Sequence, residues 1–236
     1  LKKTFKKVHQ FHAISRNIKD ELCKVGVKKE KILIIPNCTP LKKISKIKEK
    51  KNKKKITLLT IGRYAIKKKG FDLIERITKK LNKISDFKWI IIGRNTTELY
   101  KKKFIQESKK KFEIIEEIGN FNELFFPHTK LIDYYKKSHV YVNLSRVEGC
   151  PIVLLDALSS NLPIITFNTR GGDEIVVNKK NGFIIRNNDL NDFTKKIFKT
   201  KNIKFKKNSA KIKKIKKYYD LETNTKKIIS TYLMVK

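Results

Sequence analysis

The strongest constraint on the fold is an alternation of short apolar runs with longer stretches of helical periodicity. Six runs rich in Ile and Val are bounded by Gly, Asn or Pro, at positions 56–62, 87–93, 112–118, 140–145, 163–168 and 182–185. Continuous apolar strands joined by helical crossovers indicate a parallel sheet that is covered on both faces. We therefore expect an α/β fold, with a doubly wound, Rossmann-like parallel sheet spanning residues 55–207.

The residues on either side of this sheet form separate predicted units. Within residues 1–40 the pattern predicts a strand, a helix and a second strand, with Ser15 as the helix N-cap and Gly26 as its stop. Residues 41–54 are Lys-rich and lack apolar periodicity, which is typical of a linker. Residues 208–236 are expected to form one or two helices. Position 1 is not Met, which suggests a fragment of a longer chain.

The chain is strongly basic, since 58 Lys and Arg against 22 Asp and Glu give a net charge of +36. Only 7 of the 58 are Arg, and Lys, like the abundant Ile, has A/T-rich codons, so mutational bias is one explanation. The other is attraction to an anionic surface of lipid or nucleic acid. Base recognition favours Arg, and no basic recognition helix is evident. Mutational bias is therefore the simpler explanation, and if the charge has a partner, we expect an anionic membrane surface rather than nucleic acid.

The sequence also indicates where in the cell the protein is expected to work. No apolar run approaches the ~18 residues of a membrane-spanning helix, and the first residues lack the apolar segment of a signal peptide. Cys23, Cys38 and Cys150 have no metal-ligand spacing and cannot all pair, which fits a reducing environment. We expect a cytoplasmic protein that works at the inner face of the membrane if its acceptor lies there.

Two polar loops are predicted to meet at the ligand crevice of the sheet. In doubly wound sheets, ligands bind at the carboxyl ends of strands where the strand order reverses, which in the common order lies between the first and fourth strands. The first strand ends at Gly62 and Arg63, and its loop continues to Lys69, while Glu148 follows the fourth strand. The cationic loop suits a pyrophosphate, and the carboxylate suits sugar hydroxyls. Taken singly, each of these charges could equally be a solvated loop charge.

A helix is predicted to begin at Pro151, because proline favours the first helical position. The backbone from Gly149 to Val153 would then point towards a bound anion or sugar. Asp156 lies eight residues after Glu148, ~10 Å along a helix axis, so the two carboxylates can share neither a proton nor a metal ion. They could bind opposite ends of an elongated ligand, or Asp156 could be a simple helix-dipole carboxylate.

The segments around these residues follow one another in a recognisable order. Ile-Gly-Arg at 61–63 precedes Lys-Gly-Phe-Asp-Leu-Ile at 69–74, and Glu-Gly-Cys-Pro-Ile-Val-Leu-Leu-Asp occupies 148–156. The segments 162–165, 171–176 and 181–183 continue the pattern. This ordered set resembles the C-terminal, donor-binding domain of family 4 glycosyltransferases (group 1 type), which have the GT-B fold. Residues 34–37 are similar to the last strand of that family's N-terminal domain.

The resemblance implies a retaining transfer of a sugar from a nucleoside-diphosphate sugar, the donor, to a polysaccharide or glycolipid acceptor, generally without a bound metal and with no other cofactor. Arg63 and Lys69 would bind and stabilise the diphosphate, and Glu148 would hold hydroxyls of the donor sugar. Asp156 stands where the family usually has Glu and would bind the ribose with a shorter carboxylate. The remaining implied donor contacts are Gly62, Gly149, Cys150, Pro151, Ile152 and Val153. Residues 1–40 would be the tail of the N-terminal, acceptor domain, so the 236 residues alone are expected to be inactive as a hexosyltransferase.

Two other functions are compatible with the residues. A non-catalytic nucleotide-sugar-binding module would share the same donor contacts without transferring the sugar. A basic nucleic-acid-binding protein would instead depend on the Lys excess, with steeply salt-dependent binding to duplex DNA that survives the loss of Arg63.

Overall fold

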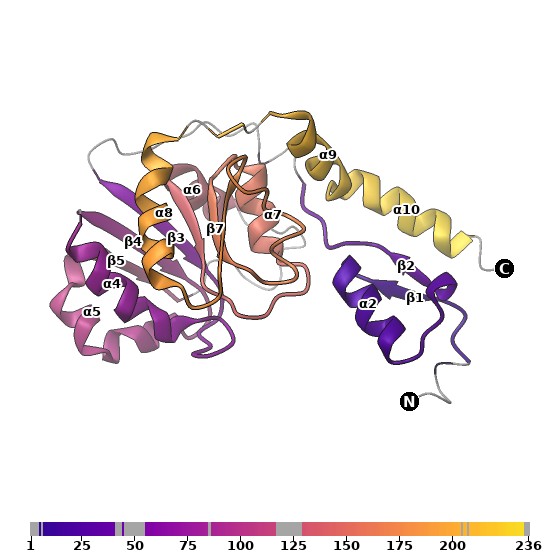
Figure 1. Ribbon diagram of the computed structural model, residues 1–236, viewed down its shortest axis with the longest axis horizontal. Coiled ribbons are helices and arrows are strands. Elements are labelled where there is room, and N and C mark those ends of the chain that lie inside the picture. The colour runs from indigo at the N-terminus through magenta and orange to yellow at the C-terminus, as the bar shows by residue number, and fades with distance from the viewer. Residues whose placement is uncertain are drawn as a thin grey trace.

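The computed structural model describes residues 5, 7–40, 44, 55–84, 86–116, 129–203, 205–206 and 208–233. The predicted linker, 41–54, lies outside the described residues except for Ile44, as do 117–118 of the third predicted strand and 234–236 of the C-terminal unit. Six parallel strands form the central sheet, in the order β5-β4-β3-β6-β7-β8 (Figure 1). They are β3 (Ile56–Ile61), β4 (Phe87–Ile92), β5 (Phe112–Ile115), β6 (Val140–Asn143), β7 (Ile164–Phe167) and β8 (Gly182–Ile185).

This sheet confirms the predicted doubly wound α/β fold. The strand order reverses between β3 and β6, the first and fourth strands of the sheet, as the common order requires. Strands β3, β4, β6 and β7 are shorter by one or two residues than the apolar runs that predicted them, because the runs include flanking loop residues. The carboxyl ends of β3 and β6 therefore lie side by side at the edge where a ligand is expected.

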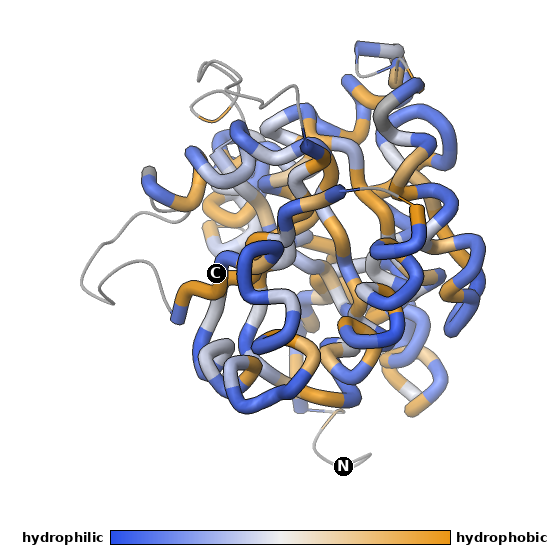
Figure 2. Tube along the Cα trace, turned by 90° about the vertical axis from the view of Figure 1, so that its left-hand side faces the viewer, coloured by the Kyte–Doolittle hydropathy of each residue, from blue (hydrophilic) through white to orange (hydrophobic). Residues whose placement is uncertain are grey.

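Both faces of the sheet are covered, which explains why its strands are apolar throughout. On β3, Leu58 packs into the core beneath α4 (Ile74–Asn82), α5 (Lys103–Glu107) and α8 (Leu190–Asn202). The next residue, Leu59, faces the opposite core, beneath α6 (Thr129–Lys137) and α7 (Ile152–Ser159). Side chains alternate across a strand, so a strand between two helical layers needs apolar residues at every position. In Figure 2, hydrophobic residues are frequent in the interior of the molecule and hydrophilic residues in its outer turns.

The N-terminal residues form a separate two-stranded parallel sheet, β1 (Phe11–Ala13) with β2 (Ile32–Ile34), joined by α2 (Arg16–Lys24). The Ser15 hydroxyl accepts a hydrogen bond from the amide of Ile18, which confirms the predicted N-cap. Gly26 follows the helix with a φ of 96°, the left-handed conformation of a helix-terminating glycine.

The chain ends in two helices, α9 (Ala210–Tyr218) and α10 (Leu221–Leu233), as the sequence predicted. In Figure 1, α10 runs alongside the N-terminal unit. The ammonium group of Lys227 donates to the carbonyl of Ile34 at 2.6 Å, which ties α10 to the end of β2. Within the part of the chain that the structure describes, no helix combines the length and apolar composition that a membrane crossing requires.

Candidate functional site

Two of the predicted site residues meet at the carboxyl edge of the sheet. Lys69, in the loop after β3, places its Nζ 2.7 Å from Oε1 of Glu148, in the loop after β6. The two residues are 79 positions apart, and their side chains are only 24% and 10% exposed. The crossover between β3 and β6 thus brings the cationic and acidic loops together, as the sequence predicted from strand order.

A second ion pair, which the sequence analysis did not predict, joins the same two loops. The guanidinium of Arg146 donates from Nη1 and Nη2 to the two carboxylate oxygens of Asp72, at 2.8 and 2.7 Å. Its Nη1 also donates to the carbonyl of Lys67, and its backbone amide donates to the carbonyl of Lys68. The hydrogen bond from Arg146 lowers the pKa of the Asp72 carboxyl. Both residues lie within three positions of a predicted site residue, and this adjacency was the available signal.

Two glycines allow the loops to approach this closely. Gly70 has a φ of 71°, and a Cβ atom there would overlap the carbonyl oxygen of Leu144 at the end of β6. A Cβ atom on Gly171, after β7, would overlap the backbone of Gly149. The space beside Gly62 is different, because a Cβ atom there would meet nothing within 4 Å. The three loops are therefore tightly packed against one another, whereas the space directly beside the Cα atom of Gly62 is open.

Arg63 follows Gly62 and is exposed. No described residue forms an ion pair or hydrogen bond with its guanidinium. Its charge is therefore available to a ligand that enters beside Gly62, which is the position predicted for a diphosphate.

The predicted helix start is one residue off. Pro151 is the N-cap of α7 with an extended ψ of 109°, so the helix begins at Ile152 rather than at the proline. The first amides of a helix, here those of Ile152 and Val153, have no intrahelical acceptor and can bind an anion. Cys150 is buried, and burial raises the pKa of its thiol to about 12, so it is held neutral. Its side chain therefore brings no negative charge to the site.

Asp156 differs from the other predicted residues because it is buried, at 1% exposure. Its Oδ1 accepts a hydrogen bond from the hydroxyl of Thr39 at 2.6 Å, and its Oδ2 has no partner among the described residues. Burial raises the pKa of its carboxyl from 3.8 to about 7. The structure thus brings Lys69 and Glu148 together at the sheet edge and places Asp156 in the interior, against the chain that returns from the N-terminal unit.

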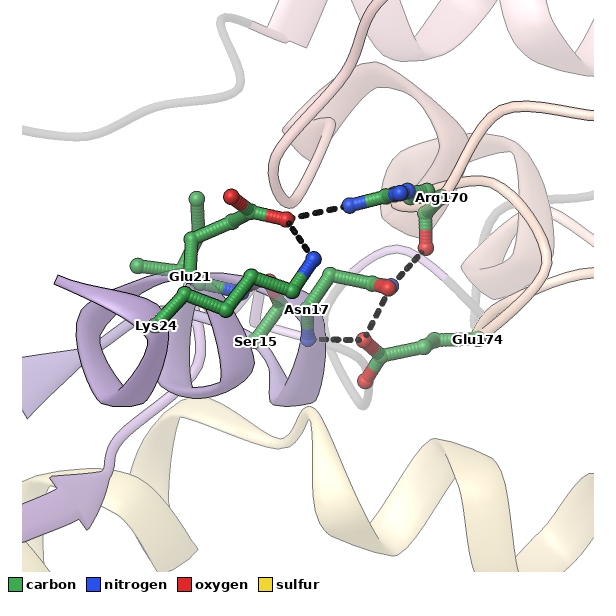
Figure 3. A network of polar contacts seen from close by, with 7 residues as sticks. Ser15, Asn17, Glu21, Lys24, Arg170 and Glu174 are labelled. Atoms are coloured by element: carbon green, nitrogen blue, oxygen red, sulfur yellow. Dashed lines mark hydrogen bonds and ion pairs between the residues drawn. The ribbon is translucent and has the colours of Figure 1, made fainter. Parts of the chain in front are cut away.

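A polar network attaches the N-terminal unit beside this site (Figure 3). The carboxylate of Glu174 accepts from the backbone amides of Arg16 and Asn17, at 3.4 Å each, and from Nδ2 of Asn17 at 3.1 Å. An anion at the first turn of α2 satisfies free amides and complements the helix dipole. The guanidinium of Arg170 extends the network by donating to the carboxylate of Glu21. This carboxylate also accepts a hydrogen bond from Nζ of Lys24 at 2.9 Å.

This network was not predicted from the sequence. Its partners in the N-terminal unit and in residues 170–174 are about 150 positions apart, so no local pattern connects them. Ile14, just before α2, lies against Gly149, with its Cδ1 3.3 Å from where a Cβ atom would stand. The N-terminal unit therefore borders the Glu148 loop. Among the described residues, no group of three or more His, Cys, Asp or Glu side chains could hold a metal ion.

Comparison with known proteins points to one family. The family model for glycosyl transferases group 1 matches residues 42–218. An uncharacterized glycosyltransferase of Haemophilus influenzae is 29% identical over 171 residues, which are 71% of this chain and 45% of that protein. The amylovoran biosynthesis glycosyltransferase AmsD of Erwinia amylovora is 28% identical over 138 residues, 56% of this chain and 35% of AmsD. The chain thus spans less than half the length of these relatives.

One solved structure shows the same fold over nearly the whole chain. Anabaena Alr3699/HepE, in complex with UDP-glucose, superposes with a TM-score of 0.76 over 97% of this chain and 64% of its own, at 13% identity. At that identity the likeness establishes the fold alone. The match of the family model to three quarters of the residues establishes more: the chain belongs to the glycosyl transferases group 1 family.

Proposed function

We propose that this protein binds the donor of a retaining glycosyltransferase, a nucleoside-diphosphate sugar, and that the enzyme transfers the sugar to a glycan or lipid-linked acceptor. The observation that carries the proposal is the Lys69–Glu148 pair at the strand-order reversal, 2.7 Å apart and mostly shielded from water. A cation and a carboxylate at one point suit a ligand with a phosphate beside a hydroxyl-bearing ring. The complex of Alr3699/HepE with UDP-glucose supports the same class of donor.

Each polar group has a distinct part in this proposal. Lys69 and Arg63 bind the diphosphate and stabilise the negative charge that grows on it as the sugar leaves. Glu148 accepts hydrogen bonds from hydroxyls of the sugar and fixes its orientation. The amides of Ile152 and Val153 at the start of α7 add donors towards the phosphates. Catalysis by such a site consists of positioning and charge stabilisation, and no step in it requires a metal ligand from this chain.

The acceptor is proposed from the relatives and from the charge of the chain. AmsD is named for amylovoran biosynthesis, which supports a polysaccharide-type acceptor. On α9, Lys213, Lys214 and Lys217 are exposed and have no ion-pair partner among the described residues. We propose that these lysines hold the protein against an anionic membrane face in the cytoplasm, where a lipid-linked acceptor would be found.

Calorimetric titration with UDP, GDP and UDP-glucose tests the donor proposal. The double variant Arg63→Ala/Lys69→Ala should lose measurable binding, because each charge-assisted contact contributes ~1.5–3 kcal/mol. Lys67→Ala/Lys68→Ala is the matched control, since it removes the same charge from exposed side chains of the same loop. Unchanged affinity of the Arg63/Lys69 variant for every nucleotide that the wild type binds would reject the proposal.

A further inference from the structure

The environment of Asp156 points to a role other than contact with a ligand. Its carboxylate is buried beneath the connecting segment, residues 35–40, which links the N-terminal unit to the rest of the chain. The hydroxyl of Thr39, itself 1% exposed, donates to Oδ1 of Asp156 at 2.6 Å. A ligand hydroxyl could reach this carboxylate only if the connecting segment moved away.

The backbone of Thr39 also forms hydrogen bonds with the C-terminal helices. Its amide donates to the carbonyl of Tyr219 at 3.2 Å, and its carbonyl accepts from the amide of Leu221 at 3.2 Å. These two contacts bind the connecting segment to the junction of α9 and α10. Figure 1 shows this segment running from β2 to the space between α7 and α9. Thr39 is thus the point where α7, the connecting segment and the C-terminal helices meet.

A second contact, two residues earlier, reaches the donor loop itself. Nδ2 of Asn37 donates to the carbonyl of Cys150 at 2.8 Å. Cys150 lies two residues after Glu148 and directly before Pro151, the N-cap of α7. The connecting segment therefore contacts the region of α7 at two places. Asn37 binds the loop just before the helix, and Thr39 binds the Asp156 carboxylate in its second turn.

The chemistry of Asp156 fits this structural role. Burial, with no partner for Oδ2 among the described residues, favours the uncharged acid and outweighs the hydrogen bond from Thr39 to Oδ1, which by itself favours the carboxylate. A ribose diol would instead be bound by an ionised carboxylate that presents both oxygens. Aspartate is one methylene shorter than the Glu that the family resemblance implies, and in this chain its carboxylate is hydrogen-bonded to the hydroxyl of Thr39.

We propose that Asp156 is a positioning residue: with Thr39 and Asn37 it fixes the connecting segment to α7, and so sets the position of the Glu148 loop relative to the N-terminal unit. Asp156 on this account makes no contact with the ribose of the donor. The expected effect of Asp156 on donor binding rests on the proposed function, whereas the hydrogen bond between Thr39 and Asp156 does not. One measurement tests the hydrogen bond and a second tests the effect on binding.

The first measurement is a double-mutant cycle on thermal unfolding with Thr39→Val and Asp156→Ala. Because the two side chains act through one hydrogen bond, the double variant should lower the midpoint by little more than the larger single effect. Thr39→Ser retains the hydroxyl and should restore the wild-type midpoint, which keeps the test valid if Asp156→Ala does not fold. Strictly additive effects, or a Thr39→Ser variant no better than Thr39→Val, would overturn the proposal.

The second measurement compares the affinities for UDP and for inorganic diphosphate, which has no ribose. Asp156→Ala should weaken both ligands by the same factor, and Asp156→Asn, whose amide oxygen can still accept from Thr39, should be close to wild type for both. A loss for UDP that exceeds the loss for diphosphate about tenfold would assign Asp156 to the ribose and reject the proposal. If the wild type binds neither ligand, the donor proposal fails, while the unfolding cycle still decides whether the contact exists.

Discussion

Lys69 and Glu148 form an ion pair of 2.7 Å across the point where the strand order of the sheet reverses. In the proposed donor complex the two side chains bind different parts of one ligand, Lys69 the diphosphate and Glu148 the sugar. The ligand must therefore replace this pair with two new sets of contacts. This exchange makes the two residues separable by experiment.

Glu148→Gln is expected to affect the affinities for UDP-glucose and for UDP differently. The affinity for UDP-glucose should fall about tenfold, ~1.4 kcal/mol, because the amide accepts more weakly from sugar hydroxyls than the carboxylate does. The affinity for UDP should stay the same or rise, since Lys69 no longer has a competing anion. Titration of wild type and variant with both ligands measures this. An equal loss for both ligands would contradict the assignment of Glu148 to the sugar.

Arg146→Ala should weaken nucleotide binding while the protein stays folded. The Arg146–Asp72 pair is 30% and 36% exposed, so its loss should cost the fold only ~1 kcal/mol. The loops after β3 and β6 lose their bidentate link, and the affinity for UDP should fall several-fold. Arg146→Lys should recover little, because an ammonium cannot make the paired contact. Unfolding in urea gives the stability and calorimetry the affinity; a variant that binds UDP as the wild type does would show that the link is dispensable.

Substitutions at Gly70 and Gly62 should have different effects, the first on stability and the second on nucleotide binding. Gly70→Ala is expected to destabilise the protein by ~1–3 kcal/mol, because its φ is positive and its Cβ atom would overlap the backbone of Leu144. Gly62→Ala should leave the unfolding midpoint unchanged, since its Cβ atom meets nothing, yet weaken UDP binding by occupying the proposed ligand space. Comparing the midpoint and the affinity of the two variants tests this; a destabilised Gly62→Ala variant would contradict it.

Asp156 should impose a pH dependence on stability. Its pKa is about 7 in the folded protein and 3.8 as a free side chain, so between these values the unfolded chain loses the proton while the folded protein keeps it. Stability contributed by this group is complete below pH 3.8 and falls as the pH rises to 7, by at most ~4 kcal/mol. Asp156→Asn should remove this part of the slope. Urea unfolding of both proteins from pH 4 to 8 measures it, and identical slopes would contradict it.

The lysines of α9 should attach the protein to anionic vesicles. Each Lys near such a surface contributes ~1 kcal/mol and is screened by salt, so Lys213, Lys214 and Lys217 changed to Gln should reduce sedimentation strongly at low salt. The control changes Lys109, Lys110 and Lys195 to Gln, which removes the same charge from exposed positions elsewhere. Equal loss in both variants, or equal binding to neutral vesicles, would leave codon bias as a sufficient explanation of the Lys excess.

The sequence by itself determined the sheet and the meeting of its loops. Apolar runs such as 56–62 and 140–145 predicted the strands, because a strand between two helical layers is apolar at every position. Parallel strands end at one edge, so strand order alone brought Lys69 near Glu148. The assignment of Pro151 to the helix missed by one residue, since a proline suits both the N-cap and the first turn. The roles of the individual site residues remain predictions.

Only the tertiary structure decided which side chains pair and which are buried. Arg146 with Asp72, Glu174 with the first turn of α2, and Thr39 with Asp156 are 74, 157 and 117 positions apart. No local pattern encodes such contacts, because they depend on how whole loops and helices pack. Spacing placed Asp156 eight residues after Glu148, on the helix that starts beside the site. Burial then separated the two, because the face of α7 that carries Asp156 lies beneath the connecting segment, while Glu148, in the loop before α7, pairs with Lys69 at the carboxyl edge of the sheet.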